Sequence, residues 1–235
     1  MEIIKCIKII DLGLLLVNEK VLVIADSHIG YEEALNKQGV LIPRLYFKDT
    51  LKRLEEILAK TGDLNVIVIN GDIKHEFGTI SDQEWRNTLK LMDFLSKHCK
   101  ELVLVRGNHD KILGPISKKR NIKFVDNIII GDKLILHGDK VDDMIKNKSI
   151  KTVIIGHEHP AVSLNDGAKV ERYKCFLKGK FKGKNLIVQP SFNLVTEGTD
   201  VTKEKLLSPF LKEISNFEVF IVGDKVYDFG KLKEL

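Results

Sequence analysis

Histidine and aspartate residues that could bind metal ions are concentrated in five short clusters. Six of the seven histidines of this 235-residue chain lie in them. In chain order the clusters are Asp26-Ser27-His28, Gly71-Asp72-Ile73-Lys74-His75, Gly107-Asn108-His109-Asp110, His137-Gly138-Asp139 and Gly156-His157-Glu158-His159. Oxygen and imidazole ligands without a thiolate suit a hard or borderline divalent ion such as manganese, iron or zinc. A carboxylate shared by two ions would hold them a few ångströms apart, so the pattern predicts a site for two metals.

Each cluster taken alone has a structural explanation. An Asp-x-His sequence can cap a helix, and a Gly-Asn-His-Asp sequence can form a turn. A histidine at a strand end is more often a hydrogen-bonded structural residue than a ligand, and short motifs also arise by chance. Five clusters that each follow a predicted strand favour one common function over five separate structural roles.

Five short apolar runs precede these clusters, and their pattern predicts buried strands. The runs are Val21–Ala25, Val66–Asn70, Leu102–Arg106, Lys133–His137 and Thr152–Gly156. Several are rich in valine and isoleucine, and each ends in a polar or glycine-containing segment. Loops at the carboxyl ends of adjacent strands open on one crevice. We therefore expect the clusters to meet there, with the neighbouring glycines allowing sharp turns and leaving room for substrate.

Helical patterns separate the early strands, and turn signals separate the later ones. We expect helices at Tyr31–Lys37, Phe47–Lys60 and Gln83–Lys97. Ser81 and Glu84 are placed as a capping box for the third helix. Strands outnumber helices after residue 124, with hairpin turns expected at Gly131-Asp132, Asp166-Gly167 and Gly223-Asp224. The sequence predicts one α/β (α+β) domain over residues 1–235, a four-layer αββα sandwich of two mixed β-sheets flanked by helices.

Composition places the chain among ordinary globular proteins. Apolar residues make up 43% and charged residues 30%, and the net charge of +5 mildly favours an anionic partner. The apolar N-terminus is interrupted by charged residues, and no apolar run is long enough to cross a bilayer. The three cysteines show no CxxC spacing. We expect a cytoplasmic protein with reduced cysteines and no membrane partner, and a homodimer is suggested by base rate alone.

The ordered series D-x-H, GD, GNH(E/D), H and GHxH resembles the motifs of the calcineurin-like metallophosphoesterases, and it is complete here. The resemblance covers most of the chain and implies a metallophosphoesterase-type fold with two divalent ions. Manganese is the first expectation, with iron, zinc or nickel as alternatives. The implied ligands are Asp26, His28 and His159 for one ion, Asn108, His137 and His157 for the other, and Asp72 for both. His109 would be the catalytic histidine, oriented by Asp110.

A later segment resembles a small branch of this superfamily, the one related to Mre11 and SbcD. The resemblance rests on Gln189-Pro190-Ser191-Phe192-Asn193 and Glu197-Gly198-Thr199, and this branch includes the bacterial DNA-ligase-associated phosphoesterases. His75, three residues after Asp72, matches a histidine found near the phosphate in Mre11-type sites, which makes it a further candidate catalytic residue. A full Mre11-type nuclease carries a capping domain and a Rad50-binding region. We expect neither here, so the resemblance does not imply double-strand-break processing.

Together these patterns predict a metal-dependent phosphodiesterase. It would hydrolyse a phosphodiester in a nucleotide-type or short nucleic-acid substrate with a hydroxide activated by two metals. His109 would stabilise or protonate the leaving oxygen. The same core also serves phosphomonoesterases and nucleotide pyrophosphohydrolases, and the motifs do not separate these activities. From a different class, the protein could be a partner-dependent subunit that binds nucleic acid.

Basic residues outside the clusters give weaker signals. Four lysines alternate around Phe181, at positions 178, 180, 182 and 184, and they could line a hairpin that meets a phosphate backbone. Runs of charge are usually solvated surface, and we favour that interpretation for these lysines and for Lys118, Lys119 and Arg120. Arg106 either points toward a substrate phosphate or pairs with a surface acid.

Overall fold

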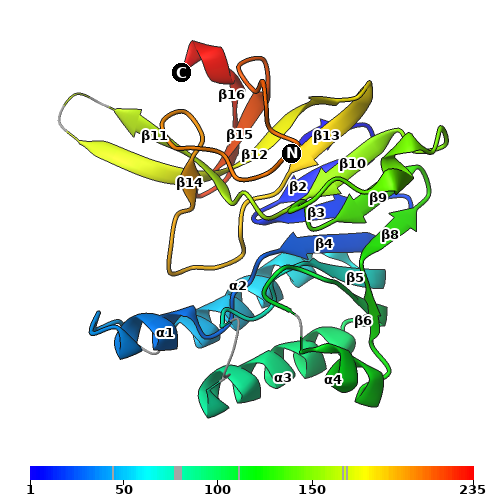
Figure 1. Cartoon of the computed structure of the whole chain (residues 1–235), viewed down its shortest axis with the longest axis vertical. Coiled ribbons are helices and arrows are strands. Elements are labelled where there is room, and N and C mark those ends of the chain that lie inside the picture. The colour runs from blue at the N-terminus through cyan, green and yellow to red at the C-terminus, as the bar shows by residue number, and fades with distance from the viewer. Residues whose placement is uncertain (44, 77–80, 111, 166, 168) are drawn as a thin grey trace.

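The computed structural model describes residues 1–43, 45–76, 81–110, 112–165, 167 and 169–235. Two β-sheets lie face to face, and the α-helices cover the outer face of the first sheet (Figure 1). Both sheets contain parallel and antiparallel strand pairs. The predicted class, two mixed sheets flanked by helices, is therefore confirmed.

The first sheet contains seven strands that are arranged in the order of the chain. They are β1 (Glu2–Ile4), β2 (Ile7–Ile10), β3 (Gly13–Leu16), β4 (Val21–Ala25), β5 (Leu64–Asn70), β6 (Cys99–Val105) and β7 (Lys123–Val125). Neighbours from β1 to β4 are antiparallel, and those from β4 to β7 are parallel. The parallel strands are nearly continuous runs of valine, isoleucine and leucine, as expected for strands covered on both faces.

The structure describes four α-helices, of which the last three pack on the core of this sheet. The four are α1 (Tyr31–Lys37), α2 (Tyr46–Thr61), α3 (Asp82–Ser96) and α4 (Gly114–Lys119). The first three lie within one residue of their predicted ends, and α4 was not predicted. Ser81 caps α3, because its Oγ accepts a hydrogen bond from the backbone N–H of Glu84 at 3.1 Å. The Glu84 carboxylate does not complete the box but accepts from the backbone N–H groups of His75 and Glu76, at 3.0 and 2.9 Å.

The second sheet contains the strands from β8 onward. They are β8 (Asn127–Ile130), β9 (Lys133–Leu136), β10 (Thr152–Ile155), β11 (Pro160–Asn165), β12 (Val170–Phe181), β13 (Lys184–Val188), β14 (Thr199–Asp200), β15 (Glu218–Val222) and β16 (Val226–Lys231). Their order is β14-β11-β12-β13-β10-β9-β8, and β15 pairs with both β12 and β16. The predicted turns at 131–132 and 223–224 join β8 to β9 and β15 to β16. Asp166 of the third turn lies outside the described residues.

Side chains between the sheets form one apolar core that continues under α2 and α3. The outer face of the second sheet has its own apolar cluster, which is covered by a 3-10 helix (Asp143–Lys146), by the segment 201–217 and by a C-terminal 3-10 helix (Leu232–Glu234). No α-helix is described on this face. Pro209 lacks an N–H group, and the N–H groups of Leu207 and Ser208 bond to the Glu158 carboxylate, so the segment is irregular here rather than helical.

Among the described residues, no helix is long and apolar enough to span a membrane.

Candidate metal centre

The five clusters meet at one edge of the sandwich. Three of them follow β4, β5 and β6 in the first sheet, and two follow β9 and β10 in the second. Each set of strands is parallel, so the carboxyl ends of its strands point the same way. Face-to-face packing brings the two sets of loops together. The clusters therefore converge across two sheets rather than along one.

Asp26, His28 and His159 form one group of possible ligands, whose donor atoms all lie within 4.8 Å of one another. The Nε2 atoms of His28 and His159 are 3.3 Å apart, and Nε2 of His159 is 3.6 Å from Oδ2 of Asp26. The backbone N–H of His157 donates to the same Asp26 oxygen at 2.8 Å. This hydrogen bond attaches a loop of the second sheet to a carboxylate of the first.

Asp72, His137 and His157 form a second group, and Asn108 lies beside it. Nε2 of His137 is 2.8 Å from Oδ1 of Asn108 and 3.1 Å from Nδ1 of His157. Oδ2 of Asp72 is 3.4 Å from Nε2 of His137 and 3.8 Å from Nε2 of His28 in the first group. One carboxylate oxygen thus lies between the two groups, where a bridging ligand would have to be.

The donor atoms fit divalent cations better than they fit one another. Imidazole nitrogens face each other in the pairs His28–His159 and His137–His157, and a pair of neutral imidazoles needs a single proton placed between them. Oδ1 of Asp26 and Nδ1 of His137 are buried 3.4 Å apart, and neither atom has a well-formed hydrogen bond among the described residues. Buried polar atoms rarely lack a partner in folded proteins, and a bound ion can supply one. The residues present therefore fit a pair of metals.

Asp72 and His137 are the electrostatic centre of the site. Burial opposes ionisation of Asp72, but the hydrogen bond and charge of His137 outweigh it and hold the pKa of Asp72 well below its usual range. Burial also opposes a charge on His137, but Asp72 and Asp26 raise the pKa of His137 to about 9. The His137 ring is therefore protonated at neutral pH when no cation is bound. A cation would displace that proton, as metal binding to histidine generally does.

Most of the predicted ligands have a backbone conformation that is unusual outside glycine. Five of the seven have φ angles between 41° and 67°: Asp26, His28, Asp72, His157 and His159. Few non-glycine residues adopt this left-handed region, and such strain concentrates at functional sites. Backbone hydrogen bonds hold the conformation, since the N–H of His28 donates to the carbonyl of Asp72 at 2.9 Å.

Glycines beside the clusters leave room for ligand side chains rather than for substrate, which corrects our expectation. A Cβ atom on Gly107 would lie 2.0 Å from Oδ1 of Asp72. A Cβ atom on Gly156 would lie 2.4 Å from Oδ2 of Asp26. Real Cβ atoms do not approach so closely, so these two positions require glycine for space.

His28, His75 and His109 form a third group next to the first two. The ring centroids of His28 and His109 are 4.9 Å apart, and Nε2 of His109 is 3.7 Å from Oδ2 of Asp72. Nδ1 of His109 faces the backbone carbonyl oxygen of His75. A carbonyl can only accept, so Nδ1 carries the proton and Nε2 points toward the centre. Burial lowers the pKa of His109, and burial together with His109 lowers the pKa of His75 to about 4.

Asp110 has a different role from the predicted one. Its carboxylate accepts hydrogen bonds from the backbone N–H groups of Ile73 and Gly107, both at 3.1 Å, and joins the loop after β5 to the loop after β6. Burial and the nearby charge of Asp72 raise the pKa of Asp110 to about 7. Buried N–H groups need an acceptor, and Asp110 supplies it. The contact that orients the His109 ring comes instead from the carbonyl of His75.

Two buried carboxylates outside the predicted set also hold the loops of the centre. Glu158, between two predicted ligands, accepts from the N–H groups of Leu207 and Ser208 at 2.9 and 2.8 Å. Glu84 holds the backbone of His75, as described above. Glu158 is noticeable in the sequence as part of the GHxH motif, and Glu84 as part of the capping box. Neither pattern indicates which backbone N–H groups elsewhere in the chain these carboxylates bind.

Arg106 lies at the rim of the centre. With Asn108 and His137 it lines a hollow of about 200 Å³. Its guanidinium pairs with Asp126 at 3.1 Å and lies over the ring of Phe124, 4.8 Å from the ring centroid. Of the two alternatives for Arg106, the structure shows the pairing with a surface acid.

The lysines around Phe181 lie away from the centre, at the turn between β12 and β13. Nζ of Lys178 pairs with Glu218 at 2.8 Å, and Nζ of Lys184 donates to the carbonyl oxygens of Asn147 and Ile150. Both lysines therefore have local structural partners, in agreement with the interpretation as surface.

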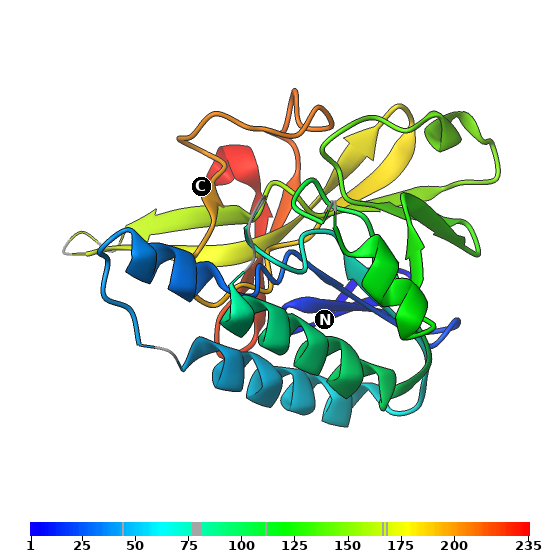
Figure 2. The same ribbon diagram turned by 60° about the horizontal axis from the view of Figure 1, so that its bottom comes forward.

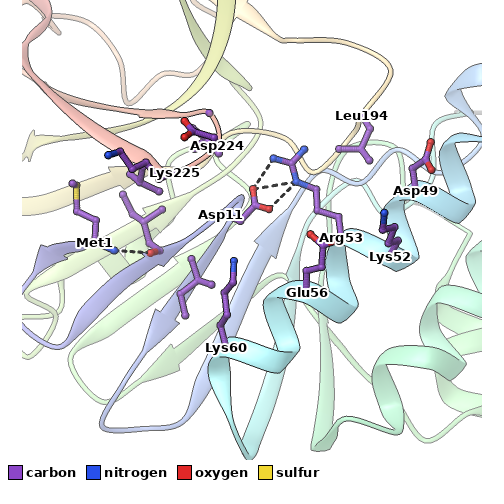
Figure 3. A pocket seen from close by; sticks show the side chains of 15 residues that line it. Met1, Asp11, Asp49, Lys52, Arg53, Glu56, Lys60, Leu194, Asp224 and Lys225 are labelled. Atoms are coloured by element: carbon purple, nitrogen blue, oxygen red, sulfur yellow. Dashed lines mark hydrogen bonds and ion pairs between the residues drawn. The ribbon is translucent and has the colours of Figure 1, made fainter.

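A larger cavity of about 680 Å³ lies between the N-terminal strands, α2 and the turn between β15 and β16 (Figure 3). Arg53 donates to both carboxylate oxygens of Asp11, and lysines and acids alternate around this pair. None of the described residues that line this cavity is a histidine. It lacks the imidazole donors that the metal centre has.

A model of the calcineurin-like phosphoesterase family matches residues 19–228. The chain belongs to this family. As a calcineurin-like phosphoesterase with grouped histidine and aspartate donors, it is a metal-dependent phosphoesterase. No curated protein matches its sequence.

One solved structure supports the fold of this calcineurin-like phosphoesterase, and others match with lower TM-scores. It is similar to the nuclease MPE of Pseudomonas putida, with a TM-score of 0.64 and 21% identity over 92% of this chain and 91% of that one. A protein of unknown function from Aquifex aeolicus matches with a TM-score of 0.41 and 18% identity, over 63% and 81% of the two chains. Zinc-bound Vps29 of Entamoeba histolytica matches with a TM-score of 0.39 and 17% identity, over 89% and 99%.

Proposed function

We propose that this phosphoesterase hydrolyses phosphodiesters in a nucleotide-type or short nucleic-acid substrate. The observation that carries the proposal is the position of Asp72, whose Oδ2 lies between the two groups of donors. The proposed ligands are Asp26, His28 and His159 for one cation, Asn108, His137 and His157 for the other, and Asp72 for both.

Two divalent cations held here would lower the pKa of a water molecule and neutralise charge on a phosphoryl group. His109 is placed to exchange a proton with the reacting oxygens, because its Nε2 points at the centre and its side chain is 13% exposed. In the tautomer fixed by the His75 carbonyl, Nε2 first accepts a proton and can then donate it to the leaving oxygen. His75, whose backbone is held by Glu84, lies beside it and faces the same space.

Two further observations support a diester of the nucleic-acid type. The fold is similar to that of a nuclease from Pseudomonas putida. The net charge of +5 mildly favours an anionic substrate.

The test is hydrolysis of bis(p-nitrophenyl) phosphate by metal-stripped protein, before and after manganese is added, with Asp72→Asn as the control. Turnover that manganese restores in the wild type but not in the control is the expected result. Faster hydrolysis of p-nitrophenyl phosphate than of the diester would instead make the protein a monoesterase. If the folded, metal-loaded protein hydrolysed neither ester, a pyrophosphohydrolase or a partner-dependent subunit would replace this proposal.

A further inference from the structure

A basic groove runs along the edge of the first sheet, between the end of α3, α4 and the first residues of β6 and β7. Its volume is about 850 Å³. Figure 2 shows α4 beside α3 at this edge of the helix layer. The charged side chains that line the groove are Lys100, Lys118, Arg120, Lys123 and a single acid, Glu101.

The basic side chains of the groove differ in whether they form a salt bridge. Arg120 pairs with Asp93, which lies outside the lining, at 2.8 Å. Lys100, Lys118 and Lys123 are exposed, and the structure shows no salt bridge for them among the described residues. Three lysines that face solvent without an ion-pair partner are available for an anionic ligand. This separates them from the lysines of the β12–β13 turn, three of which have ion-pair or hydrogen-bond partners.

The groove leads toward the metal centre. Strand β7 runs from Lys123 beside the groove to Val125, parallel to β6, and the chain enters the centre directly after β6 ends. Phe124 lines the groove, and the guanidinium of Arg106 lies over its ring. Arg106 in turn lines the hollow that contains Asn108 and His137. Arg106 therefore links the groove to the hollow beside Asn108 and His137, which three acids, Asp126, Asp139 and Asp142, also line.

Arg106 offers a flat surface at the inner end of this path. One face of its guanidinium is covered by Phe124, its edge is fixed by Asp126, and the side chain is 48% exposed. Unpaired bases commonly stack on guanidinium planes, whereas bases in a duplex are already stacked on one another. This geometry favours a single strand over a duplex.

We propose that the groove binds a single nucleic-acid strand, with its phosphates along Lys100, Lys118 and Lys123 and a base stacked on Arg106, so that the strand enters the metal centre past Asn108. The inference rests on the proposed phosphodiesterase activity and specifies its substrate. Phosphate contacts of this kind give affinity that falls steeply with salt and depends little on sequence. The stacked base adds affinity without sequence readout.

The experiment measures binding of a fluorescent oligothymidylate to the manganese-free protein at several salt concentrations. The double variant Lys118→Glu/Lys123→Glu should bind at least about tenfold more weakly at low salt, and its salt dependence should be shallower by roughly one to two ion equivalents. Arg106→Ala should also weaken binding, but with little change in the salt dependence. Hydrolysis of bis(p-nitrophenyl) phosphate by the manganese-loaded double variant should match the wild type, because the small diester does not reach the groove.

The matched control is Lys212→Glu/Lys233→Glu, which changes net charge equally with exposed lysines on the far side of the second sheet. Wild-type affinity in this control, with weaker binding in the groove variant, supports the proposal. Equal weakening in both variants, unchanged binding in the groove variant, or tighter binding of duplex than of single strand would overturn it. Failure of the wild type to hydrolyse the small diester would count against the proposed function alone, because strand binding is measured without turnover.

Discussion

At the scale of single residues, Asp72 connects more of the centre than any other side chain described here. Its Oδ2 lies within 4 Å of His28, His109 and His137, and its Oδ1 accepts from the backbone N–H of His109 at 2.9 Å. Asp72→Asn removes the charge that both donor groups share. We expect metal content and turnover to fall together, with turnover reduced by more than about a hundredfold. Metal analysis beside the diester assay checks this, and a fully loaded, active variant would contradict the bridging role.

His109 should behave differently from Asp72. It is not among the proposed ligands, and its Nε2 points toward the centre, where it can exchange a proton. His109→Asn should lower turnover by about a hundredfold or more while metal content stays at the wild-type level. Metal analysis and the diester assay test this prediction. Full turnover in this variant would show that another group exchanges the proton, and a loss of metal would make His109 a ligand.

Lys174 leads to a prediction about pH and stability. Its side chain is almost completely buried, Nζ donates to Oγ of Ser191 at 2.9 Å, and burial lowers the pKa of Lys174 to about 8. In the unfolded chain the pKa returns to about 10.4. Between these two values the unfolded state binds more protons, so this residue makes the free energy of unfolding rise with pH, by at most about 3 kcal/mol. Below pH 8 both states are protonated and the contribution is constant.

Urea unfolding of the wild type and of Lys174→Met at a series of pH values isolates this contribution. The difference in unfolding free energy, wild type minus variant, should increase between about pH 8 and 10. Lys212→Met, at an exposed position, serves as the control and should show no such trend. A flat difference for Lys174→Met would mean that the folded protein keeps this lysine charged at an ordinary pKa.

Residue types and spacing predicted which side chains would gather, but not every bond they make. The side chains that gather were recognisable because each follows a strand, and parallel strand ends open on one crevice. Asp110 was assigned to the wrong partner, since the sequence does not show that two buried N–H groups, of Ile73 and Gly107, need its carboxylate. Glu158 was missed for a similar reason, because its partners lie about fifty residues later in the chain.

At the scale of elements, the loop after β6 has space for glycine alone at Gly107. The Gly107→Ala methyl would overlap Oδ1 of Asp72, so the carboxylate would have to move away from the donors it faces. We expect metal affinity to fall by about 10–100-fold, the usual effect of disturbing the surroundings of a ligand. Isothermal titration with manganese measures it. Gly114→Ala is the control, because its Cβ would meet only Phe124, at 3.9 Å, and equal losses in the two variants would contradict the steric argument.

Periodicity predicted β4, β5 and β6 of the first sheet and the helices α1, α2 and α3. It did not predict β1, β2, β3 or β7, each of which has only three or four residues. The six-residue helix α4 has too short a pattern to be recognised. The outer face of the second sheet differs more from the expectation. Leu206, Phe210 and Leu211 have helix-like spacing, but Pro209 and the hydrogen bonds to Glu158 keep the segment irregular. Contacts between residues distant in the sequence therefore determine the conformation of this segment, and a local sequence pattern does not reveal them.

At the scale of the whole molecule, the centre lies between two sheets that share one apolar core. Four proposed ligands come from loops of the first sheet and three from loops of the second. We propose that residues 1–235 fold as one domain for this reason, since each of the two proposed ligand sets takes residues from both sheets. The proposed cations would then join the sheets at one edge, and the apolar core joins them over the rest of their inner faces.

This arrangement predicts that metal removal lowers stability as well as activity. Without cations, imidazole nitrogens face each other and the buried charges of Asp26, Asp72 and His137 lie close together in a strained backbone. Manganese at about 100 times its dissociation constant would add about 2.7 kcal/mol to the free energy of unfolding. For a chain of this size that corresponds to a rise in melting temperature of about 5–10 °C. Thermal unfolding followed by circular dichroism, with and without manganese, measures this rise.

Asp72→Asn should show little of this rise in melting temperature, because the loss of the shared charge weakens metal binding at both groups. An equal rise in the variant would place the stabilising metal elsewhere on the protein, and no rise in a wild type that retains its metal would mean that the core alone holds the sheets together.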